Sequence, residues 1–420
     1  MLKEKDEAKK KKSSAVENNS SFIKEMKDVA IVKDTANFLN RVVRERGLDM
    51  DTVVIRTVLD GGGGSFKVMA SVFDGASDPE VTFSMIETPS ELNTGVNRLL
   101  PLAVVENCPE RHHNLRQILE QLRLQEVEGL FIVGDLKIYN IMLGLSAHGG
   151  KYSCAYCLGV ADLDSGEYRT FGHLQDHYTS YLQNGSNPKN MQYYFNTINK
   201  CLIVGERKER VLDKIMLPEL HLMIGNCNHL LGPIKELWPG IMDWFKRNSI
   251  FWRGYQGGGL DGNNSRKFLQ KLDILKSEVP RKLHPILETL KLFNLVVESC
   301  FSHELRSDYR EKILNYKQSY KQLSDYCDKR LKFKLTVSWK VHCVTAHLEE
   351  FLTRQKTGLA KFAEQTGEAA HCSMKPVMKR HSRSEGHKDH GQKQMIAVRK
   401  FGSWNLKDIK QFGDTKLKLI

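Results

Sequence analysis

Two apolar runs joined by four glycines constrain the fold of this chain more than any other stretch. VVIRTVLD (53–60) and SFKVMASVFD (65–74) are rich in apolar and β-branched residues, and Gly61 to Gly64 separate them. This pattern predicts two antiparallel strands joined through a glycine turn. Asp60 ends the first run, where a carboxylate interrupts otherwise apolar sequence. Its position requires an explanation from turn chemistry or from function.

The next 75 residues continue with elements of alternating type. RLLPLAVVEN (98–107) predicts a third strand, residues 111–125 have helical apolar spacing, GLFIVGD (129–135) predicts a buried strand, and residues 137–149 predict a helix. Strand, strand, strand, helix, strand, helix is the order of the ribonuclease H-like fold, whose mixed sheet carries carboxylates at the ends of its central strands. We therefore expect an α/β protein of this fold.

In such a fold two aspartates would meet. Asp60 ends the first strand and Asp135 ends the fourth, and these strands would lie side by side with the two carboxylates within metal-bridging distance. The alternative is that each aspartate ends a strand and begins a turn, a common role for this residue.

A second group of polar residues has the spacing of zinc ligands. Cys154 and Cys157 form a C-x-x-C pair, and His342 and His347 are separated by four residues, within the range found in zinc sites. Four ligands of this kind suit a closed, tetrahedral, structural zinc site. Cys343, His371 or Cys372 could replace one of the histidines. The chain has nine cysteines, an odd and mostly scattered set that argues against a disulfide framework.

Composition and charge narrow the class of protein. The chain has 420 residues, 40% of them hydrophobic, with no apolar run of 18 residues and no apolar signal segment, so we expect no membrane partner and a cytosolic or nuclear location. The net charge is +13, and residues 371–420 carry twelve Lys or Arg against four acids. Such a segment suits a polyanion such as DNA, or is simply a solvated tail. Lys9 to Lys12 form either a nuclear-localisation patch or a solvated charge run.

The pattern along the chain divides it into five segments. Residues 158–335 predict a mainly helical insertion, in which His221 and His229 are expected to be packed residues and not ligands. The other four segments are a disordered, basic and polar N-terminal segment with a short helix (1–48), the first part of the ribonuclease H-like domain (49–157), the helices with the two zinc-type histidines and the glutamates that follow them (336–400) and a C-terminal tail (401–420).

Taken in chain order, these motifs resemble the catalytic core of the Transib transposases and of the V(D)J recombinase catalytic subunit. The resemblance covers about residues 50 to 400. LDGGGG and GDLKIYNIMLGLSAHGGKYSCAYC match the segments that carry the first two acids, which implies Asp60 and Asp135 as catalytic metal ligands. KFAEQTGEAAH matches the segment of the third acid, which implies Glu368, with Glu364 as the alternative.

The resemblance also implies cofactors and chemistry. Cys154 and Cys157 with His342 and His347 in HCVTAH would hold Zn²⁺, and the three acids would hold two Mg²⁺ or Mn²⁺ ions for phosphodiester hydrolysis and strand transfer. The implied partner is double-stranded DNA, bound by a homodimer in the nucleus. Five basic residues after Glu368 would contact its backbone, namely Lys375, Lys379, Arg380, Arg383 and Lys388.

Two other functions fit the same residues. One is a domesticated, non-catalytic DNA-binding or zinc-scaffold protein, and the other is a structure-selective nuclease of the same fold. Only about fifty residues precede the first catalytic strand, which leaves little room for the domain that binds transposon ends in the family. A chain that is truncated, domesticated or dependent on another recognition element is therefore expected.

Overall fold

The fold is described from a computed structural model. It describes residues 29–61, 65–74, 99–106, 108–146, 150–253, 258–363 and 417–419, together with the isolated positions 367, 374, 376, 379 and 380. The remaining residues are not described.

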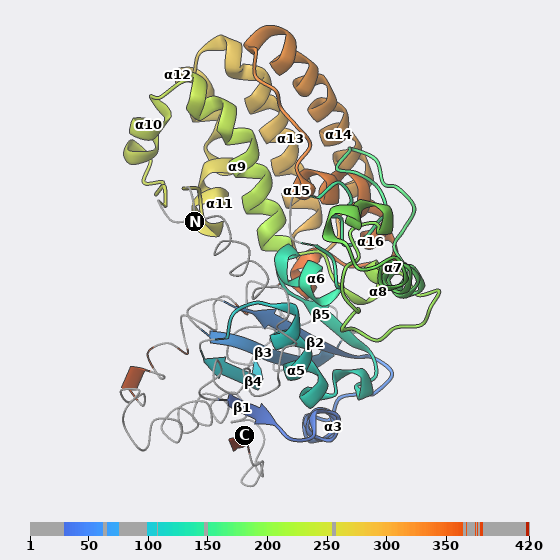
Figure 1. The fold of residues 1–420 in the computed structure, drawn as a ribbon. Coiled ribbons are helices and arrows are strands. Elements are labelled where there is room, and N and C mark those ends of the chain that lie inside the picture. Colours follow the sequence, from blue (N-terminus) through green and yellow to red (C-terminus); the bar gives the residue numbers. More distant parts are fainter. Residues whose placement is uncertain are drawn as a thin grey trace, which may run out of the picture.

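The described strands form one mixed sheet in the order β5-β2-β3-β4-β1-β6 (Figure 1). β2 pairs with β5 in parallel, and the other neighbours pair in an antiparallel manner. The six strands are β1 (Val29–Val32), β2 (Val53–Asp60), β3 (Ser65–Asp74), β4 (Leu100–Glu106), β5 (Leu130–Val133) and β6 (Leu417–Leu419). The structure is thus α/β with a mixed sheet, and the glycines lie between two antiparallel strands as predicted.

The central strands are buried on both faces. Every residue of β2 between its two ends is buried, and the same holds for β3. A strand with only one covered face would alternate between apolar and polar residues, whereas a strand covered on both faces reads as a continuous apolar run. This explains why both strands are mostly apolar, with Arg56 and Lys67 as buried exceptions, and Asp60 stands at the end of β2, where it is partly exposed.

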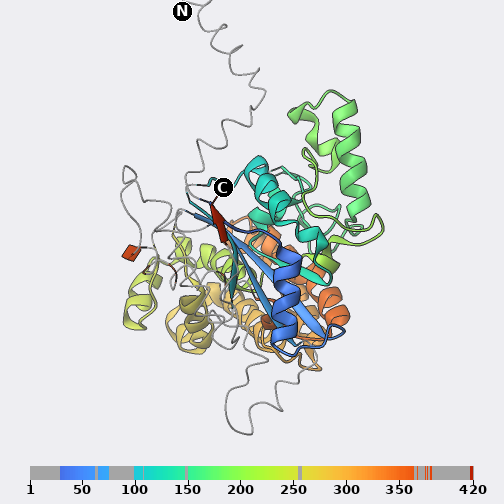
Figure 2. The ribbon, with the colours of Figure 1, turned by 90° about the horizontal axis from the view of Figure 1, so that it is seen from below.

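Helices at the margins of the sheet complete this part of the core. α3 (Thr35–Glu45) begins at Asp34, whose side chain accepts a hydrogen bond from the Asn37 amide at 3.0 Å, and it contacts β3. Figure 2 shows α3 lying beside the strands. α5 (His112–Leu122) packs against β4 and against α6 (Leu136–Met142). α6 follows directly after β5.

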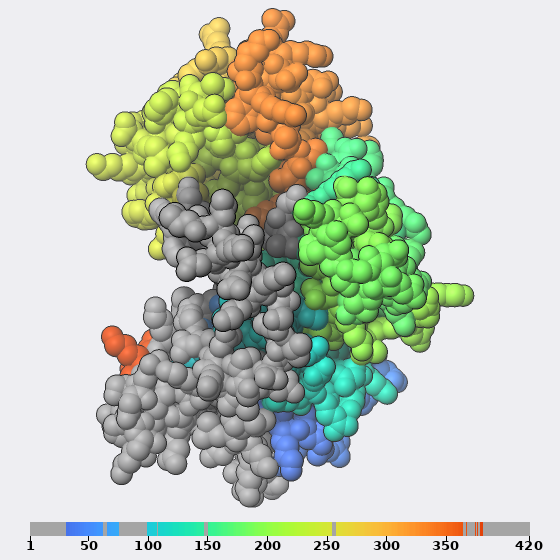
Figure 3. Space-filling view, in the orientation of Figure 1, coloured from blue at the N-terminus to red at the C-terminus, as the bar shows by residue number. Residues whose placement is uncertain are grey.

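The insertion is mainly helical, as predicted, and its buried apolar residues belong to the same core cluster as those of the sheet. Trp244, Phe268 and Phe293 are among its completely buried side chains. Figures 1 and 3 show its yellow-green to orange helices at the opposite end of the molecule from the blue strands. Its helices are α7 (Phe171–Gln183), α8 (Val211–Lys214), α9 (Glu219–Leu237), α10 (Ile241–Arg247), α11 (Gly262–Gln270), α12 (Leu272–Glu278), α13 (His284–Cys300) and α14 (Tyr309–Tyr326), and α15 (Trp339–His342) and α16 (Leu348–Gln355) follow.

Two strands differ from the sequence-based expectation. β1 lies in segment 1–48, which was expected to be disordered apart from a short helix, and β6 lies in the segment expected to be a tail. Both are runs of three or four residues that show no period. They form strands because β1 finds hydrogen-bonding partners in β4 and β6. The helix expected in segment 1–48 is present as α3. No helix within the described ranges is both long and apolar enough to cross a bilayer.

Candidate metal centre and carboxylate site

Cys154 and Cys157 lie on a tight turn that directs both sulfur atoms to one side. The Tyr156 amide donates to Cys154 Sγ and the Gly159 amide donates to Cys157 Sγ, each at 3.4 Å. Gly159 is needed here, because a Cβ atom at that position would lie 2.9 Å from the Gly166 backbone nitrogen and 3.3 Å from Cys157 Sγ. The turn therefore has the form of a zinc knuckle, with amide groups directed at both sulfur atoms.

The two histidines come from a locally widened helix. α15 ends at His342, and Cys343–His347 (η7) is a π-helical turn that runs into α16. In an α-helix, side chains five residues apart point in clearly different directions, whereas i→i+5 hydrogen bonding brings them onto nearly the same face. The Nε2 atoms of His342 and His347 are 3.1 Å apart as a result. The π-helical turn thus brings together the side chains of two histidines that are separated by four residues in the sequence.

Together the four residues form a buried cluster of metal-ligand type. Cys154 Sγ lies 3.3 Å from His347 Nε2, Cys157 Sγ lies 3.4 Å from His342 Nε2, and one ligand atom from each of the four residues lies within 4.8 Å of the others. Zinc bonds of about 2.0–2.3 Å in a tetrahedron would separate neighbouring ligand atoms by about 3.3–3.8 Å. The cluster could therefore bind a zinc ion, as its spacing in the sequence predicted.

The protonation of three of the four groups bears on metal binding. His342 Nδ1 lies 2.6 Å from the Asp162 carbonyl oxygen, which can only accept, so Nδ1 carries the proton and Nε2 presents its lone pair to the cluster. Burial lowers the pKa of His347 and thus favours its neutral form. Burial also raises the pKa of Cys154 to about 12, so an ion must displace its proton.

Of the three alternative ligands, Cys343 lies in the described part of the chain. Cys343 is buried, and its thiol adds to the rise in the pKa of Cys154 that burial causes, but Cys343 is not one of the four converging residues. His371 and Cys372 lie outside the described residues. Cys343 is the first residue of the π-helical turn and lies beside the Cys2His2 cluster.

Asp60 and Asp135 lie at the ends of neighbouring parallel strands. β2 pairs with β5 through Ile55 opposite Leu130 and Val58 opposite Val133. Continuing this register by two residues brings Asp60 opposite Asp135. Strands β2 and β5 are neighbours, as the strand order predicted, so both aspartates lie at the edge of the sheet where these two strands end.

Each aspartate also has a local role. Asp135 is the N-cap of α6, and its Oδ1 accepts a hydrogen bond from the Ile138 amide at 2.6 Å. This is the turn-forming role that the sequence left open. Asp60 stands opposite Lys67 on β3. Lys67 is only 6% exposed, and burial lowers its pKa to about 8 although Asp60 and Glu106 favour its charged form.

Glu110 is a third acid at this edge that the sequence analysis did not identify. A Cβ atom at Gly61 would lie 1.8 Å from Glu110 Oε1, so the carboxylate occupies the space that a side chain after Asp60 would fill. Lys137, on the first turn of α6, forms an ion pair with Glu110. The hydrogen bond to Glu110 raises the pKa of Lys137, and Asp135 adds to the rise. The segment CPERHH around Glu110 has no motif, so only the close approach to Gly61 reveals it.

Glu368 and its alternative Glu364 lie outside the described residues. Ala363, just before Glu364, and Gly367, just before Glu368, are described. Arg56 Nη1 donates to the carbonyl oxygens of Lys361 and Ala363, each at 3.2 Å. A Cβ atom at Gly367 would lie 2.4 Å from Val58 Cγ1. Arg56 and Val58 lie on the same face of β2 as Asp60, because alternate residues of a strand share a face. Lys361 and Ala363 thus lie beside Arg56, and Gly367 lies beside Val58, two positions closer to Asp60 along β2.

His229 and five basic residues after Glu368 were also singled out in the sequence. His229 is a packed residue, as expected, with Nε2 at 2.8 Å from the Tyr320 hydroxyl. Lys379 and Arg380 are exposed, whereas Lys375, Arg383 and Lys388 lie outside the described residues.

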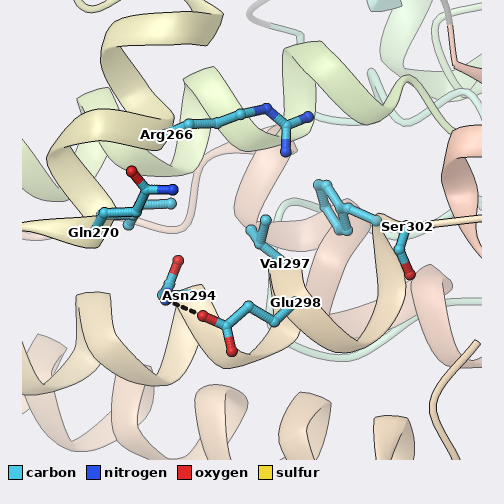
Figure 4. A pocket seen from close by; sticks show the side chains of 8 residues that line it. Arg266, Gln270, Asn294, Val297, Glu298 and Ser302 are labelled. Atoms are coloured by element: carbon cyan, nitrogen blue, oxygen red, sulfur yellow. Dashed lines mark hydrogen bonds between the residues drawn. The ribbon is translucent and has the colours of Figure 1, made fainter.

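A separate cavity lies within the helical region, between α11 and α13 (Figure 4). It has a volume of about 210 Å³. Arg266 and Asn294, two of its polar side chains, are paired: Arg266 donates to Glu219 Oε1 at 2.7 Å and Asn294 donates to Glu298 Oε1 at 2.8 Å. None of its lining residues belongs to the metal centre or to the carboxylate site.

Comparison with known proteins adds no assignment. No family model matches the sequence, and a search of curated proteins gives no match. The resemblance to transposase cores therefore stands on the motifs and on the geometry described above.

Proposed function

We propose that this chain is a metal-dependent phosphodiester-cleaving enzyme of the DDE transposase type, built on a ribonuclease H-like fold and acting on double-stranded DNA. The observation that carries the proposal is the parallel register of β2 and β5, in which the paired residues Val58 and Val133 each stand two positions before an aspartate at one edge of the sheet. Aspartates that served only as turn residues would need no such register. The contacts of Ala363 with Arg56 and of Gly367 with Val58 support Glu368, the residue after Gly367, as the third acid.

The carboxylates suit hard cations. Asp60, Asp135 and the nearby Glu110 offer oxygen atoms, which Mg²⁺ and Mn²⁺ prefer, whereas the thiols lie in the separate buried cluster. Two such ions would activate a water molecule and stabilise the leaving oxygen. The protein residues would hold the acids in position: Asp135 through its cap on α6, and Glu110 through Lys137. Lys340 would add a positive charge near Asp135, since the attraction of Asp135 partly offsets the effect of burial on the pKa of Lys340.

The Cys2His2 cluster would hold a structural Zn²⁺. Cys154 and His347 are 193 residues apart in the sequence, so an ion between them would join the start of the insertion to the helices that follow it. Its role would be to hold α15 and α16 against the carboxylate domain. Because Lys340 lies two residues before His342, the same ion would also hold Lys340 in position.

The test is cleavage of labelled duplex DNA by the purified chain with Mg²⁺ or Mn²⁺. Asp60→Asn and Asp135→Asn should each lower the rate at least about 100-fold, because loss of a metal-binding carboxylate removes several kcal/mol of transition-state stabilisation. Asp273→Asn is the matched control, since Asp273 is an exposed acid on α12 that pairs with Lys291. Equal rates for all four proteins would contradict the proposal.

The products separate this function from its alternatives. Cleavage followed by joining of the freed 3′ end to a second duplex supports a transposase. Cleavage of branched DNA without joining would favour a structure-selective nuclease. Binding without cleavage under either metal ion would favour the zinc-scaffold alternative, for which the Cys2His2 cluster is the supporting observation. A homodimer on DNA and a nuclear location remain parts of the proposal to be tested with the full chain.

A further inference from the structure

Arg169 is a completely buried arginine next to the Cys2His2 cluster. It has an exposed fraction of 0%. Tyr168 forms an isolated β-bridge with Cys157, and the Arg169 amide donates to the Tyr156 carbonyl at 2.9 Å. The backbone of Arg169 is thus paired with the same turn that carries the two cysteines.

The side chain of Arg169 reaches back to this turn. Nη2 lies 3.2 Å from the carbonyl oxygen of Cys157, 3.4 Å from that of Tyr152 and 3.4 Å from that of Phe195. Tyr152 precedes the C-x-x-C pair and Cys157 ends it, so one terminal nitrogen contacts both ends of the segment. The third carbonyl ties this segment to residues that follow η3 (Pro188–Tyr194). A charged donor makes stronger hydrogen bonds than a neutral one, which suits a contact that must hold a loop closed.

No carboxylate in the described residues forms an ion pair with Arg169. Burying an unpaired cation costs several kcal/mol, and Nε and Nη1 of Arg169 have no hydrogen-bond partner among the described atoms. Burial lowers the pKa of Arg169 to about 10, while the thiols of Cys154 and Cys157 act in the opposite direction. An apolar side chain would fill the same space at lower cost, so the arginine requires a reason for its presence.

We infer that Arg169 is a positioning residue of the metal centre, which holds the C-x-x-C turn closed so that Cys154 and Cys157 direct their sulfur atoms at one zinc ion. The inference rests on the proposed zinc centre. It assigns to Arg169 the outer-shell role that hydrogen-bonded groups have around other metal sites, where their loss weakens metal affinity by about 10–100-fold.

The experiment measures zinc affinity of the full chain by competition with a chelator, and geometry through the absorption spectrum of the Co²⁺-substituted protein. Arg169→Met keeps a long side chain but has no donors, and it should bind zinc about 10–100-fold more weakly and shift the Co²⁺ bands. Arg169→Lys keeps a charged donor, but its side chain is one atom shorter than that of arginine. It should therefore weaken zinc binding and shift the Co²⁺ bands less than Arg169→Met does. Arg207→Met is the control, because Arg207 is exposed and pairs with Asp176.

The outcomes distinguish this inference from the zinc proposal. Wild-type affinity and spectrum in Arg169→Met would overturn the role of Arg169 and leave the zinc centre intact. If Arg169→Met does not fold, an unchanged affinity and spectrum in Arg169→Lys would overturn it in the same way. An unmodified protein that binds no zinc would instead overturn the zinc centre, and this inference with it. A lower melting temperature with unchanged affinity and spectrum would indicate a purely structural arginine.

Discussion

Arg56 and Ala363 are 307 residues apart in the chain, yet Arg56 Nη1 lies 3.2 Å from the Ala363 carbonyl oxygen. The guanidinium is completely buried, and its Nε also donates to Ser71 Oγ at 3.0 Å. The strand that ends at Asp60 is therefore tied directly to the segment that leads to Glu368. This contact connects the two ends of the proposed catalytic domain across the whole helical insertion.

Arg56→Met should destabilise the protein, because it leaves the carbonyl groups of Lys361 and Ala363 without their donor. Each buried acceptor left unsatisfied costs about 1–3 kcal/mol, so the free energy of unfolding should fall by about 2 kcal/mol or more. Chemical unfolding measures this, with Arg44→Met, an exposed position on α3, as the control. An unchanged unfolding midpoint for Arg56→Met would show that the contact does not stabilise the fold.

Gly61→Ala should displace Glu110. The new methyl group would lie 1.8 Å from Glu110 Oε1, which forces the carboxylate to move. If Glu110 belongs to the carboxylate site, DNA cleavage should fall while zinc content stays the same. Gly232→Ala in α9 is the control, since a Cβ atom there meets nothing within 4 Å. Full activity of Gly61→Ala would remove Glu110 and the glycine from the proposed site.

Cys154→Ser and His347→Ala should each abolish zinc binding, and the unmodified chain should contain one zinc ion. The loss should lower stability by several kcal/mol, a part of the roughly 10–16 kcal/mol with which zinc-finger peptides bind their metal. Elemental analysis and thermal unfolding measure both effects. Cys300→Ser, which changes a buried thiol in α13 outside the cluster, should keep its zinc. Metal-free wild-type protein of unchanged stability would contradict this prediction.

The free energy of unfolding should fall in mild acid because His177 becomes protonated more easily in the unfolded chain. Burial lowers its pKa from 6.5 to about 4, and the charges of Arg169 and His173 act in the same direction while Asp176 opposes them. As the pH falls, the unfolded chain therefore binds a proton at His177 before the folded chain does. The part of the free energy of unfolding that depends on a neutral His177 is complete above about pH 6.5 and is lost as the pH falls towards 4. His177→Phe, which can keep the stacking on Phe195, should flatten this part of the pH dependence, measured by unfolding between pH 7.5 and 4. The same substitution at His284 should leave it in place.

The basic segment after Glu368 should contribute to DNA affinity through phosphate contacts. Neutralising Lys379, Arg380 and Arg383 together should lower the slope of log affinity against log salt by about two to three units, with similar losses for unrelated DNA sequences. Binding titrations at several salt concentrations measure the slope. A solvated tail with no role in binding predicts an unchanged slope and affinity, and that result would reject the segment as a DNA contact.

The sequence by itself determined the elements and the chemistry of the candidate sites. Continuous apolar runs predicted β2 and β3 because both strands are buried on both faces, and the Cys154, Cys157, His342 and His347 spacing predicted a metal site because ligand geometry limits the spacing within each pair. The apolar pattern also predicted the helical insertion. These features depend on residues close together in the chain, where period and spacing carry the information.

Tertiary structure alone decided the relationships between distant residues. Glu110 follows no motif, and it reaches the carboxylate site only because Gly61 leaves space for it. The four-residue β1 has no readable period and forms a strand because β4 offers hydrogen-bond partners. Arg56 and Arg169 belong to no motif in the sequence, whereas the fold buries both and uses them to hold chain segments together. Burial and long-range hydrogen bonding depend on how the elements pack, so no local pattern could have revealed these roles.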